Sequence, residues 1–550
     1  MSSLFRKKSA TQALDDAAKG LSEAHEHSLK KTLNVRDLTF FGIAAIIGAG
    51  SFSSLGQACF DGGTGVILLF IMCTVACGFT ALCYAEFASR VPVSGSAYTY
   101  AYVSFGELFA WIIGWALLME YSIGNIYVAF SWSGYFTNLL EGVGLHMPEW
   151  LTTNYRSAHQ SFLDSTEGEG FTAWLTAPSI GGLRIIFDLP AFLVNIFITW
   201  LVYIGVKESR NVSNAMVIIK LAIIALVIGV GVFYVDIENW TPFMPNGFGG
   251  VMAGVSAVFF AYIGFDAVST LAEESNNPQR DLPRGMIYSL AICTVAYIAL
   301  ALVLTGMISY EQLGVSDPLA EVFKLKDVKW MLFIVSIAAV VAMTSVLLVF
   351  QMGQPRIWMS MSRDGLLPAR FASIHPKYKT PGFATIVTGL VVGLPIFFTN
   401  EKFVLDFTSI GTLFAFVLVC GGVLVLPPRE KTTGGFNLPY VNGKWIVPVA
   451  MAIGFGLLLF FNPGYVSSKF DFSDEVAAEN IPMLAFFAIC IIISFLSFVK
   501  NFSLIPVCGV LSCCYLLTGM APSNWTWFSI WLVIGLLIYF GYSRRNSKLN

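Results

Sequence analysis

Long apolar stretches follow one another along almost the whole chain, each separated from the next by a short polar segment. A helix needs about 20 apolar residues to cross a bilayer. Because lipid offers no hydrogen bonds to exposed backbone groups, runs of this length predict membrane-spanning helices. Fourteen such runs occur, near residues 38–59, 64–88, 108–140, 186–206, 212–235, 250–272, 286–308, 329–359, 382–399, 403–426, 445–462, 482–499, 502–519 and 525–542.

The polar segments between these runs differ in their content of lysine and arginine. Cytoplasmic segments of membrane proteins carry an excess of both residues. A cytoplasmic N-terminus leaves few of them outside, and an even number of spans puts the C-terminus on the same side. We therefore expect a multi-pass protein of the cytoplasmic (plasma) membrane with both termini in the cytoplasm and with its longest outer connection, 141–185, capping an outer vestibule. The basic residues then left outside are Arg156, Arg184, Lys324, Lys326, Lys329, Lys402 and Lys469.

Composition narrows the class of protein further. Of the 550 residues, 56% are hydrophobic and 12% are charged, which is typical of a helical membrane protein and excludes the soluble globular classes. The ten cysteines lie mostly within apolar runs and show no metal-ligand spacing. The five histidines lie in tails or loops. We expect neither an enzyme nor a resident cofactor or metal, and no nucleic-acid partner.

Two of the apolar runs are interrupted by glycine near their middle. The segment "IIGAGSF" (46–52) interrupts the first run, and "FFAYIGFDAV" (259–268) interrupts the sixth. A helix broken within the bilayer leaves backbone groups that only protein, water or a ligand can satisfy. Corresponding interruptions five helices apart indicate a transporter built from inverted repeats, with its substrate bound at the breaks.

The first break offers two kinds of backbone group. The outer half-helix begins near Gly50, so its free N–H groups favour a carboxylate. The inner half ends near Ala45 and Ile46, whose carbonyls favour an ammonium group, and the pair suits the backbone of an α-amino acid. A close helix crossing is the alternative explanation of the glycines. The candidate substrate-binding residues are Ala45, Ile46, Gly48, Ala49, Gly50, Ser51, Phe260, Ala261, Ile263 and Gly264.

Charged residues also occur within the apolar runs. Lys220 lies about eight residues into the fifth run, which is deep for snorkelling, so it either still reaches the headgroups or faces a polar cavity. Glu120, in the third run, is either a proton carrier, a counter-charge or a packing group. Asp266 follows the sixth break and either meets a cationic side chain or caps the half-helix behind it. Ser269 is a candidate hydroxyl of the side-chain pocket, with packing as the default.

Several motifs resemble the amino acid–polyamine–organocation (APC) superfamily and, within it, the cationic amino acid transporter family with its bacterial members. The resemblance covers about residues 30–430. It implies an all-α polytopic membrane protein with a leucine-transporter-type five-plus-five inverted repeat and about 14 transmembrane helices. The motifs are "IIGAGSF", "GWALLMEY" (114–121), "GVKESRNVSNAMVIIK" (205–220), "FFAYIGFDAVSTLAEESNNPQRDLPRG" (259–285) and "GQPRIWMSMSRDGLLP" (353–368).

On that fold the chain divides into five parts. We expect a cytoplasmic tail at 1–35, a first inverted repeat at 36–235 and a second at 236–430. Additional helices then occupy 431–543, and a cytoplasmic tail follows at 544–550.

The resemblance also implies roles for single residues. Lys220 matches a fifth-helix lysine that takes the place of a sodium ion in sodium-independent members and braces the first helix against the eighth. Its ammonium would then donate to carbonyls near Ala44 or Ile47, either as a proton-coupling group or as a fixed tether. Phe350 matches a pocket position that is small in arginine-carrying members, which argues against a cationic substrate. Ser51 replaces the isoleucine that is usual in the first break.

The expected function is secondary active import of L-amino acids by alternating access, with the substrate held at the unwound parts of the first and sixth helices. The proton gradient is the expected energy source, coupled through Lys220 and Glu120. A cationic amino acid or polyamine exchanger is the alternative within transport, and a non-transporting amino acid sensor or receptor is the alternative of another class. The expected partners are the amino acid and the lipid bilayer, and the sequence points to no particular protein partner.

Overall fold

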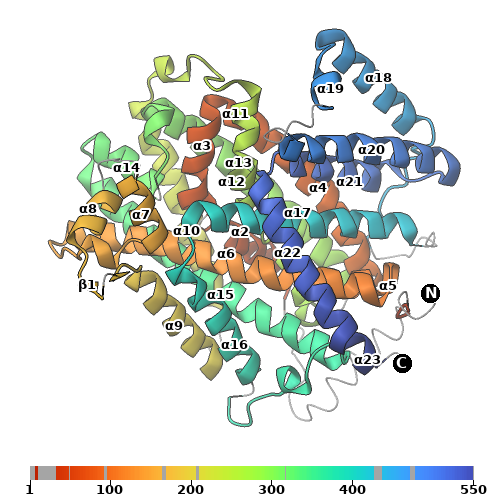
Figure 1. The fold of residues 1–550 in the computed structure, drawn as a ribbon, viewed down its shortest axis with the longest axis horizontal. Helices are drawn as coiled ribbons and strands as arrows, with labels where there is room; N and C mark the ends of the chain where they lie inside the picture. Colours follow the sequence, from red (N-terminus) through yellow and green to blue (C-terminus); the bar gives the residue numbers. More distant parts are fainter. Residues whose placement is uncertain are drawn as a thin grey trace.

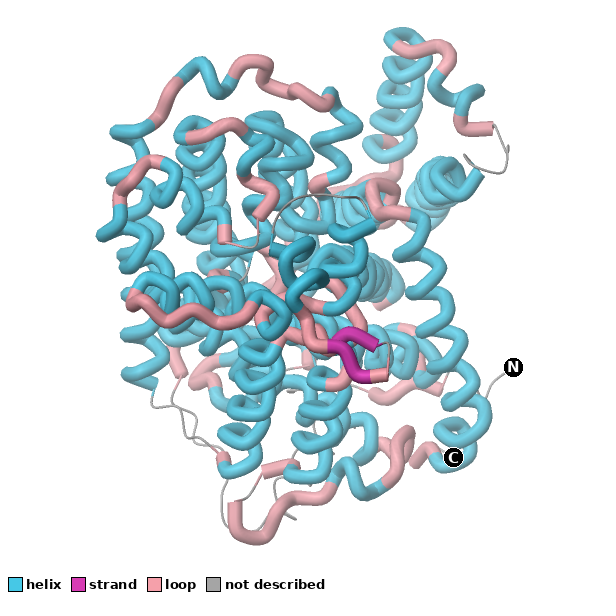
Figure 2. The backbone as a smooth tube through the Cα atoms, turned by 60° about the vertical axis from the view of Figure 1, so that its left-hand side comes forward, coloured by secondary structure: helices cyan, strands magenta, loops and turns pink. Residues whose placement is uncertain are grey.

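The computed structural model describes residues 6–9, 33–48, 50–91, 96–163, 169–181, 183–205, 210–315, 317–378, 380–426, 436–470 and 477–548. Figure 2 shows that helices make up most of this chain. A short hairpin interrupts them, in which β1 (Ser179–Ile180) pairs antiparallel with β2 (Leu183–Arg184).

The main helices follow the predicted apolar runs in order (Figure 1). They are α2 (Val35–Ile46), α3 (Leu55–Gly62), α4 (Val66–Arg90), α6 (Glu107–Gly142), α9 (Leu189–Ile204), α10 (Arg210–Gly231), α11 (Gly247–Ala253), α12 (Val255–Phe260), α13 (Pro278–Met307), α15 (Lys329–Arg363), α16 (Gly382–Gly393), α17 (Glu401–Val425), α18 (Ile446–Phe461), α20 (Ala477–Lys500), α21 (Leu504–Leu517) and α22 (Pro522–Ile538). Shorter helices connect them: α5 (Ser96–Ser104), α7 (Tyr155–Leu163), α8 (Glu169–Thr176), α14 (Pro318–Leu325), α19 (Tyr465–Ser468) and α23 (Arg544–Asn546).

The surface of the helices fits a lipid environment. Within the described residues, nine helical segments are long and apolar enough to cross a membrane, and four shorter apolar helices accompany them. Phe460 on α18 is 78% exposed, and Ile491 on α20 is 71% exposed. Large apolar side chains on the outside are unfavourable in water but not against lipid tails. The expectation of an all-helical, polytopic membrane protein is therefore confirmed.

Both glycine interruptions appear as breaks in the helices. The first span consists of α2, a π-helical turn η1 (Gly50–Ser54) and α3. The sixth consists of α11 and α12, four turn residues and a 3-10 helix η6 (Phe265–Glu274). Helix η6 starts after Gly264, whose φ of 112° lies in the left-handed region that favours glycine. The structure does not test the five-part division of the chain.

Long helices connect the two ends of the molecule. Helix α6 has 36 residues, so it is about 54 Å long at 1.5 Å per residue, and it packs against α15 and α17. Near the C-terminus, α22 is fastened to α6 by a reciprocal pair of tryptophans. The Trp115 indole N–H donates to the Trp531 carbonyl at 2.8 Å, and that of Trp531 donates to the Trp115 carbonyl at 3.1 Å.

Candidate functional site

The two helix breaks lie against each other in reversed order. A Cβ added at Gly50 would lie 2.5 Å from the Cα of Ala261, where the second break begins. A Cβ added at Gly264, where the second break ends, would lie 3.0 Å from the carbonyl carbon of Ala45 at the end of α2. Any side chain at either glycine would therefore push the two breaks apart. The two broken helices thus run in opposite directions, so that the end of each break meets the start of the other.

A small cavity, here called the central cavity, lies between the breaks, α6 and α15. Its volume, measured as the space open to the centre of a water-sized sphere, is about 10 Å³. That is room for roughly one water. The residues that line it are Ala45, Ile46, Gly48, Gly50, Val128, Phe260, Ile263, Val346 and Phe350.

Seven of the thirteen residues proposed for binding the substrate and its side chain line the central cavity: Ala45, Ile46, Gly48, Gly50, Phe260, Ile263 and Phe350. Ser51 does not line it, because its hydroxyl donates to the Gly48 carbonyl at 3.0 Å. Ala261 and Gly264 pack behind the lining against the first break. Ser269 is fully buried outside the lining. Ala49 lies outside the described residues.

Two lining residues were missed by the sequence analysis. Val128 comes from α6 and Val346 from α15, both within uniformly apolar runs. Val346 is also the neighbour of the first break, since a Cβ added at Gly48 would lie 2.3 Å from its Cγ2. No local signal separates either valine from the other apolar residues of its helix.

Lys220, on α10, is 2% exposed, and its side chain points at the end of α2. Its ammonium donates to the carbonyls of Ala44 at 3.2 Å and Ile47 at 3.0 Å, and to the hydroxyl of Ser345 on α15 at 2.6 Å. The last carbonyls of a helix have no intrahelical partner, and here an ammonium supplies the donors. One side chain thereby joins α10, α2 and α15. It does not reach for the headgroups.

A tyrosine completes the same helix end. The Tyr297 hydroxyl, from α13, donates to the Ile46 carbonyl at 2.9 Å. The sequence analysis assigned this carbonyl to the substrate ammonium, and one of its two lone pairs is thus already used. Tyr297 is fully buried, and nothing in its sequence surroundings distinguishes it from other helix tyrosines.

The two buried carboxyl groups lie apart from Lys220. Glu120 is 4% exposed on α6, with Thr412 of α17 beside it. Asp266 is 3% exposed in the first turn of η6, where its carboxyl group lies beside backbone groups of Gly264, Ala267 and its own residue. Within the described chain, no hydrogen bond or ion pair joins either group to Lys220.

A larger cavity, here called the vestibule cavity, lies toward the start of α17. Its volume by the same measure is about 210 Å³. Tyr127 separates it from the central cavity, because this residue lines the larger cavity while its ring packs edge-on against Phe260 at 4.7 Å between centroids. The lining residues are Ser53, Gln57, Tyr127, Ser157, Gly314, Val315, Asn400, Glu401, Lys402 and Leu405. Ser157 lies on α7, so the connection 141–185 reaches this cavity.

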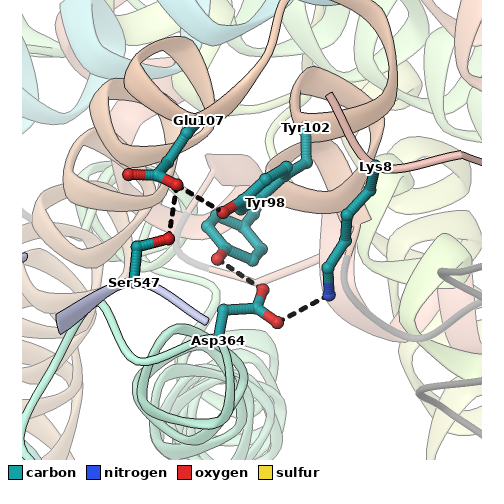
Figure 3. A network of polar contacts seen from close by, with 6 residues as sticks. All are labelled: Lys8, Tyr98, Tyr102, Glu107, Asp364 and Ser547. Atoms are coloured by element: carbon teal, nitrogen blue, oxygen red, sulfur yellow. Dashed lines mark hydrogen bonds and ion pairs between the residues drawn. The ribbon is translucent and has the colours of Figure 1, made fainter. Parts of the chain in front are cut away.

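The opposite end of α6 is closed by a polar network, here called the tail network (Figure 3). Asp364, just after α15, accepts from the Lys8 ammonium at 2.7 Å and from the Tyr98 hydroxyl at 2.6 Å. Glu107, at the start of α6, accepts from the hydroxyls of Tyr102 at 3.1 Å and Ser547. Burial, and after it the neighbouring carboxylates, raises the pKa of both phenols well above its usual range, so they remain donors. The network therefore ties residues near both chain termini to the ends of α6 and α15.

Comparison with known proteins gives a consistent family. Residues 33–477 match the amino acid permease family, and residues 503–547 match the C-terminal region of amino acid permeases. The branched-chain amino acid permease BcaP of Bacillus subtilis is 39% identical over 551 aligned positions, which cover 100% of this chain and 99% of the relative.

Two further relatives have names that give other substrates. The methylthioribose transporter of Bacillus subtilis is 38% identical, with 100% of both chains covered. The vacuolar cationic amino acid transporter 2 of Arabidopsis thaliana is 31% identical, with 97% of this chain and 92% of the relative covered. All three are transporters and none is an enzyme. The chain therefore belongs to the amino acid permease family, within the APC superfamily, as a cationic amino acid transporter-like member whose general function is amino acid transport.

Proposed function

We propose that this protein imports neutral L-amino acids with apolar side chains across the cytoplasmic membrane, coupled to protons. The observation that carries this proposal is the central cavity between two broken helices. From the first break it is lined by Ala45, Ile46, Gly48 and Gly50, whose backbone groups suit the ammonium and carboxylate shared by all α-amino acids. In this proposal both termini lie in the cytoplasm. The protein has fourteen membrane-spanning helices, and the two broken helices are the first helices of the two halves of a five-plus-five repeat.

The lining of the central cavity supports an apolar side chain. Val128, Ile263, Val346 and Phe350 provide its other surfaces. Phe350 is fixed by its neighbours, since a Cβ added at Gly124 would lie 3.1 Å from its ring and its ring packs edge-on against Tyr121 at 5.6 Å between centroids. No carboxylate is among the lining residues of this described cavity, so a cationic side chain would be left unpaired, at considerable cost. The name of the BcaP relative agrees with this substrate class.

Lys220 is the proposed coupling group. As an ammonium it supplies the donors for Ala44 and Ile47 and holds α2 against α15. Loss of the proton removes the charge and one donor, which weakens this link and frees α2 to move. Proton binding and helix movement are thereby connected. Glu120 and Asp266 are close enough to interact with each other, and Glu120 is the second candidate in the proton route.

Uptake into proteoliposomes tests the proposal. The panel contains labelled L-isoleucine, L-leucine, L-arginine, putrescine and methylthioribose, each with and without an inward proton gradient. We expect accumulation of the branched-chain amino acids only with the gradient. Accumulation of arginine or putrescine by exchange, accumulation of methylthioribose alone, or binding without uptake would contradict the proposal and favour an exchanger, a sugar transporter or a receptor.

Three lysine variants separate coupling from tethering. Lys220→Ala leaves two buried carbonyls short of donors, at about 1–3 kcal/mol each, and we expect uptake to fall to background. Lys220→Gln keeps an amide donor but cannot carry the charge. Residual uptake in Lys220→Gln that no longer responds to the gradient supports coupling, whereas uptake that still responds makes Lys220 a tether. Lys326→Ala, at an exposed lysine, is the matched control and should behave as wild type.

A further inference from the structure

The vestibule cavity contains an opposite pair of charges that the proposed function does not use. Glu401 and Lys402 are neighbours in the first turn of α17, and both line the cavity. Adjacent residues on a helix point in directions about 100° apart and do not face each other. Within the described chain, neither side chain makes an ion pair within 4.0 Å. The cavity wall therefore presents a carboxylate and an ammonium side by side without their neutralising each other.

The position of Glu401 is not explained by helix capping. Asn400 already caps α17, because its side chain accepts from the backbone N–H of Phe403 at 3.0 Å. Glu401 instead turns toward the first span, where its Oε1 accepts from the Ser53 hydroxyl at 3.2 Å. The Ser131 hydroxyl lies 3.5 Å from the same oxygen. Two hydroxyls orient this carboxylate, and no hydrogen bond from a described residue engages its Oε2.

The rest of the cavity wall matches the remaining parts of an amino acid. The side-chain amides of Gln57 and Asn400 stand beside the charged pair, and Val315 and Leu405 add apolar surface. A volume of about 210 Å³ has room for about seven waters at roughly 30 Å³ each, in contrast to the single water of the central cavity. The space is thus large enough for a whole substrate molecule.

From these observations we infer that the vestibule cavity is a second, outer binding site for a zwitterionic amino acid with an apolar side chain. The substrate ammonium binds Glu401, its carboxylate binds Lys402, and its side chain packs toward Val315 and Leu405. Tyr127 forms the floor of this site and separates the bound molecule from the central cavity. This inference rests on the proposed function for the identity of the ligand.

Binding stoichiometry of the purified full-length protein tests the outer site. The probe is labelled L-isoleucine, and bound ligand per protein is measured at saturation. We expect two molecules per wild-type chain and one in Gly50→Ala, whose added Cβ would lie 2.5 Å from the Cα of Ala261 at the central site. In Glu401→Gln and in Lys402→Gln, we expect the outer site to weaken by about 30-fold or more, because each loses one partner of a charge pair. Glu238→Gln and Lys326→Gln change exposed residues and serve as controls that should still bind two.

The outcomes separate this inference from the proposed function. One bound isoleucine in the wild type, unchanged in Glu401→Gln and Lys402→Gln, together with active uptake, overturns the outer site alone. Neither binding nor uptake of any amino acid in the panel overturns both. A wild type that binds two and a Glu401→Gln variant that binds the second molecule with unchanged affinity shows that this molecule lies elsewhere, which again contradicts the outer site. Thermal unfolding of each variant confirms that it is folded.

Discussion

The two ends of α6 use their charged groups in different ways. At the end formed by α7, α14 and the start of α17, Glu401 and Lys402 line a cavity of about 210 Å³ without an ion pair from the described residues. At the end near the termini, Asp364 and Glu107 are bound by an ammonium and by hydroxyls in the tail network. Figure 1 shows α7 and α14 on the left and α5 with both termini on the right.

This contrast indicates which end is open in the structure. In the tail network an ammonium and hydroxyls bind the carboxylates, whereas Glu401 has hydroxyl partners alone and Lys402 faces Asp61 and Asp406 without a described ion pair. The described part of the structure is therefore hollow at the vestibule cavity and held together by an ion pair and hydrogen bonds at the tail network, with a central cavity that has room for roughly one water. A transporter that works by alternating access must also adopt a second conformation, which is open at the tail network and closed at the vestibule cavity. Substitutions at the contact between the two breaks, in the tail network and at Tyr127 should therefore change uptake and the free energy of unfolding to different degrees.

The largest effect is expected at the contact between the two breaks. Gly264→Ala places a Cβ 3.0 Å from the Ala45 backbone and forces a left-handed φ of 112° on an alanine. We expect uptake of isoleucine to be abolished and the free energy of unfolding to fall by about 1–3 kcal/mol from strain alone. Gly78→Ala is the control, because a Cβ there meets nothing within 4 Å. Equal uptake in the two variants would show that the breaks tolerate separation.

An intermediate effect is expected in the tail network. Asp364→Asn removes the charge that pairs with Lys8, where both side chains are at most 15% exposed. The loss should lower the free energy of unfolding by about 1–3 kcal/mol, measured by thermal unfolding. The control is Asp327→Asn, since Asp327 is 86% exposed and lies 3.8 Å from Lys329, and such pairs contribute little. An unchanged midpoint in Asp364→Asn would mean that the tail end is closed by packing alone.

The smallest effect is expected at the vestibule floor. Tyr127→Phe removes the hydrogen bond to the Ser53 hydroxyl, 3.2 Å long, but keeps the ring that covers Phe260. We expect a loss of about 0.5–1.5 kcal/mol in unfolding free energy and uptake close to that of wild type. Tyr310→Phe, whose hydroxyl makes a 3.4 Å bond at the surface, is the comparison variant. Loss of uptake in Tyr127→Phe would assign the hydroxyl, rather than the ring, to the separation of the two cavities.

The sequence predicted those parts of the site that depend on local backbone chemistry. Glycine interruptions within apolar runs located both breaks, because few other residues permit such geometry. The resemblance to a transporter family placed Lys220 near the Ala44 and Ile47 carbonyls, and the structure has both hydrogen bonds. Whether Lys220 exchanges its proton stays a prediction.

Other parts of the site depend on contacts between helices that are far apart in the sequence. Tyr297 and Ser345 reach the same helix end from α13 and α15, and neither stands out within its own segment. Glu401 was not singled out because an acidic residue at a helix start is favourable for ordinary reasons. The Ser51 hydroxyl bonds to its own turn, at Gly48, instead of lining the central cavity, since a local acceptor is always within reach of a serine.

The small volume of the central cavity has a consequence for affinity. A cavity of about 10 Å³ cannot hold an amino acid, so only the fraction of molecules with separated helices can bind one there. The apparent dissociation constant rises in proportion as that fraction falls. If roughly one molecule in a hundred is separated, the affinity is about 100-fold weaker than the contacts alone would give, or about 2.7 kcal/mol. Substitutions far from the substrate that favour separation would then tighten binding without adding a single contact.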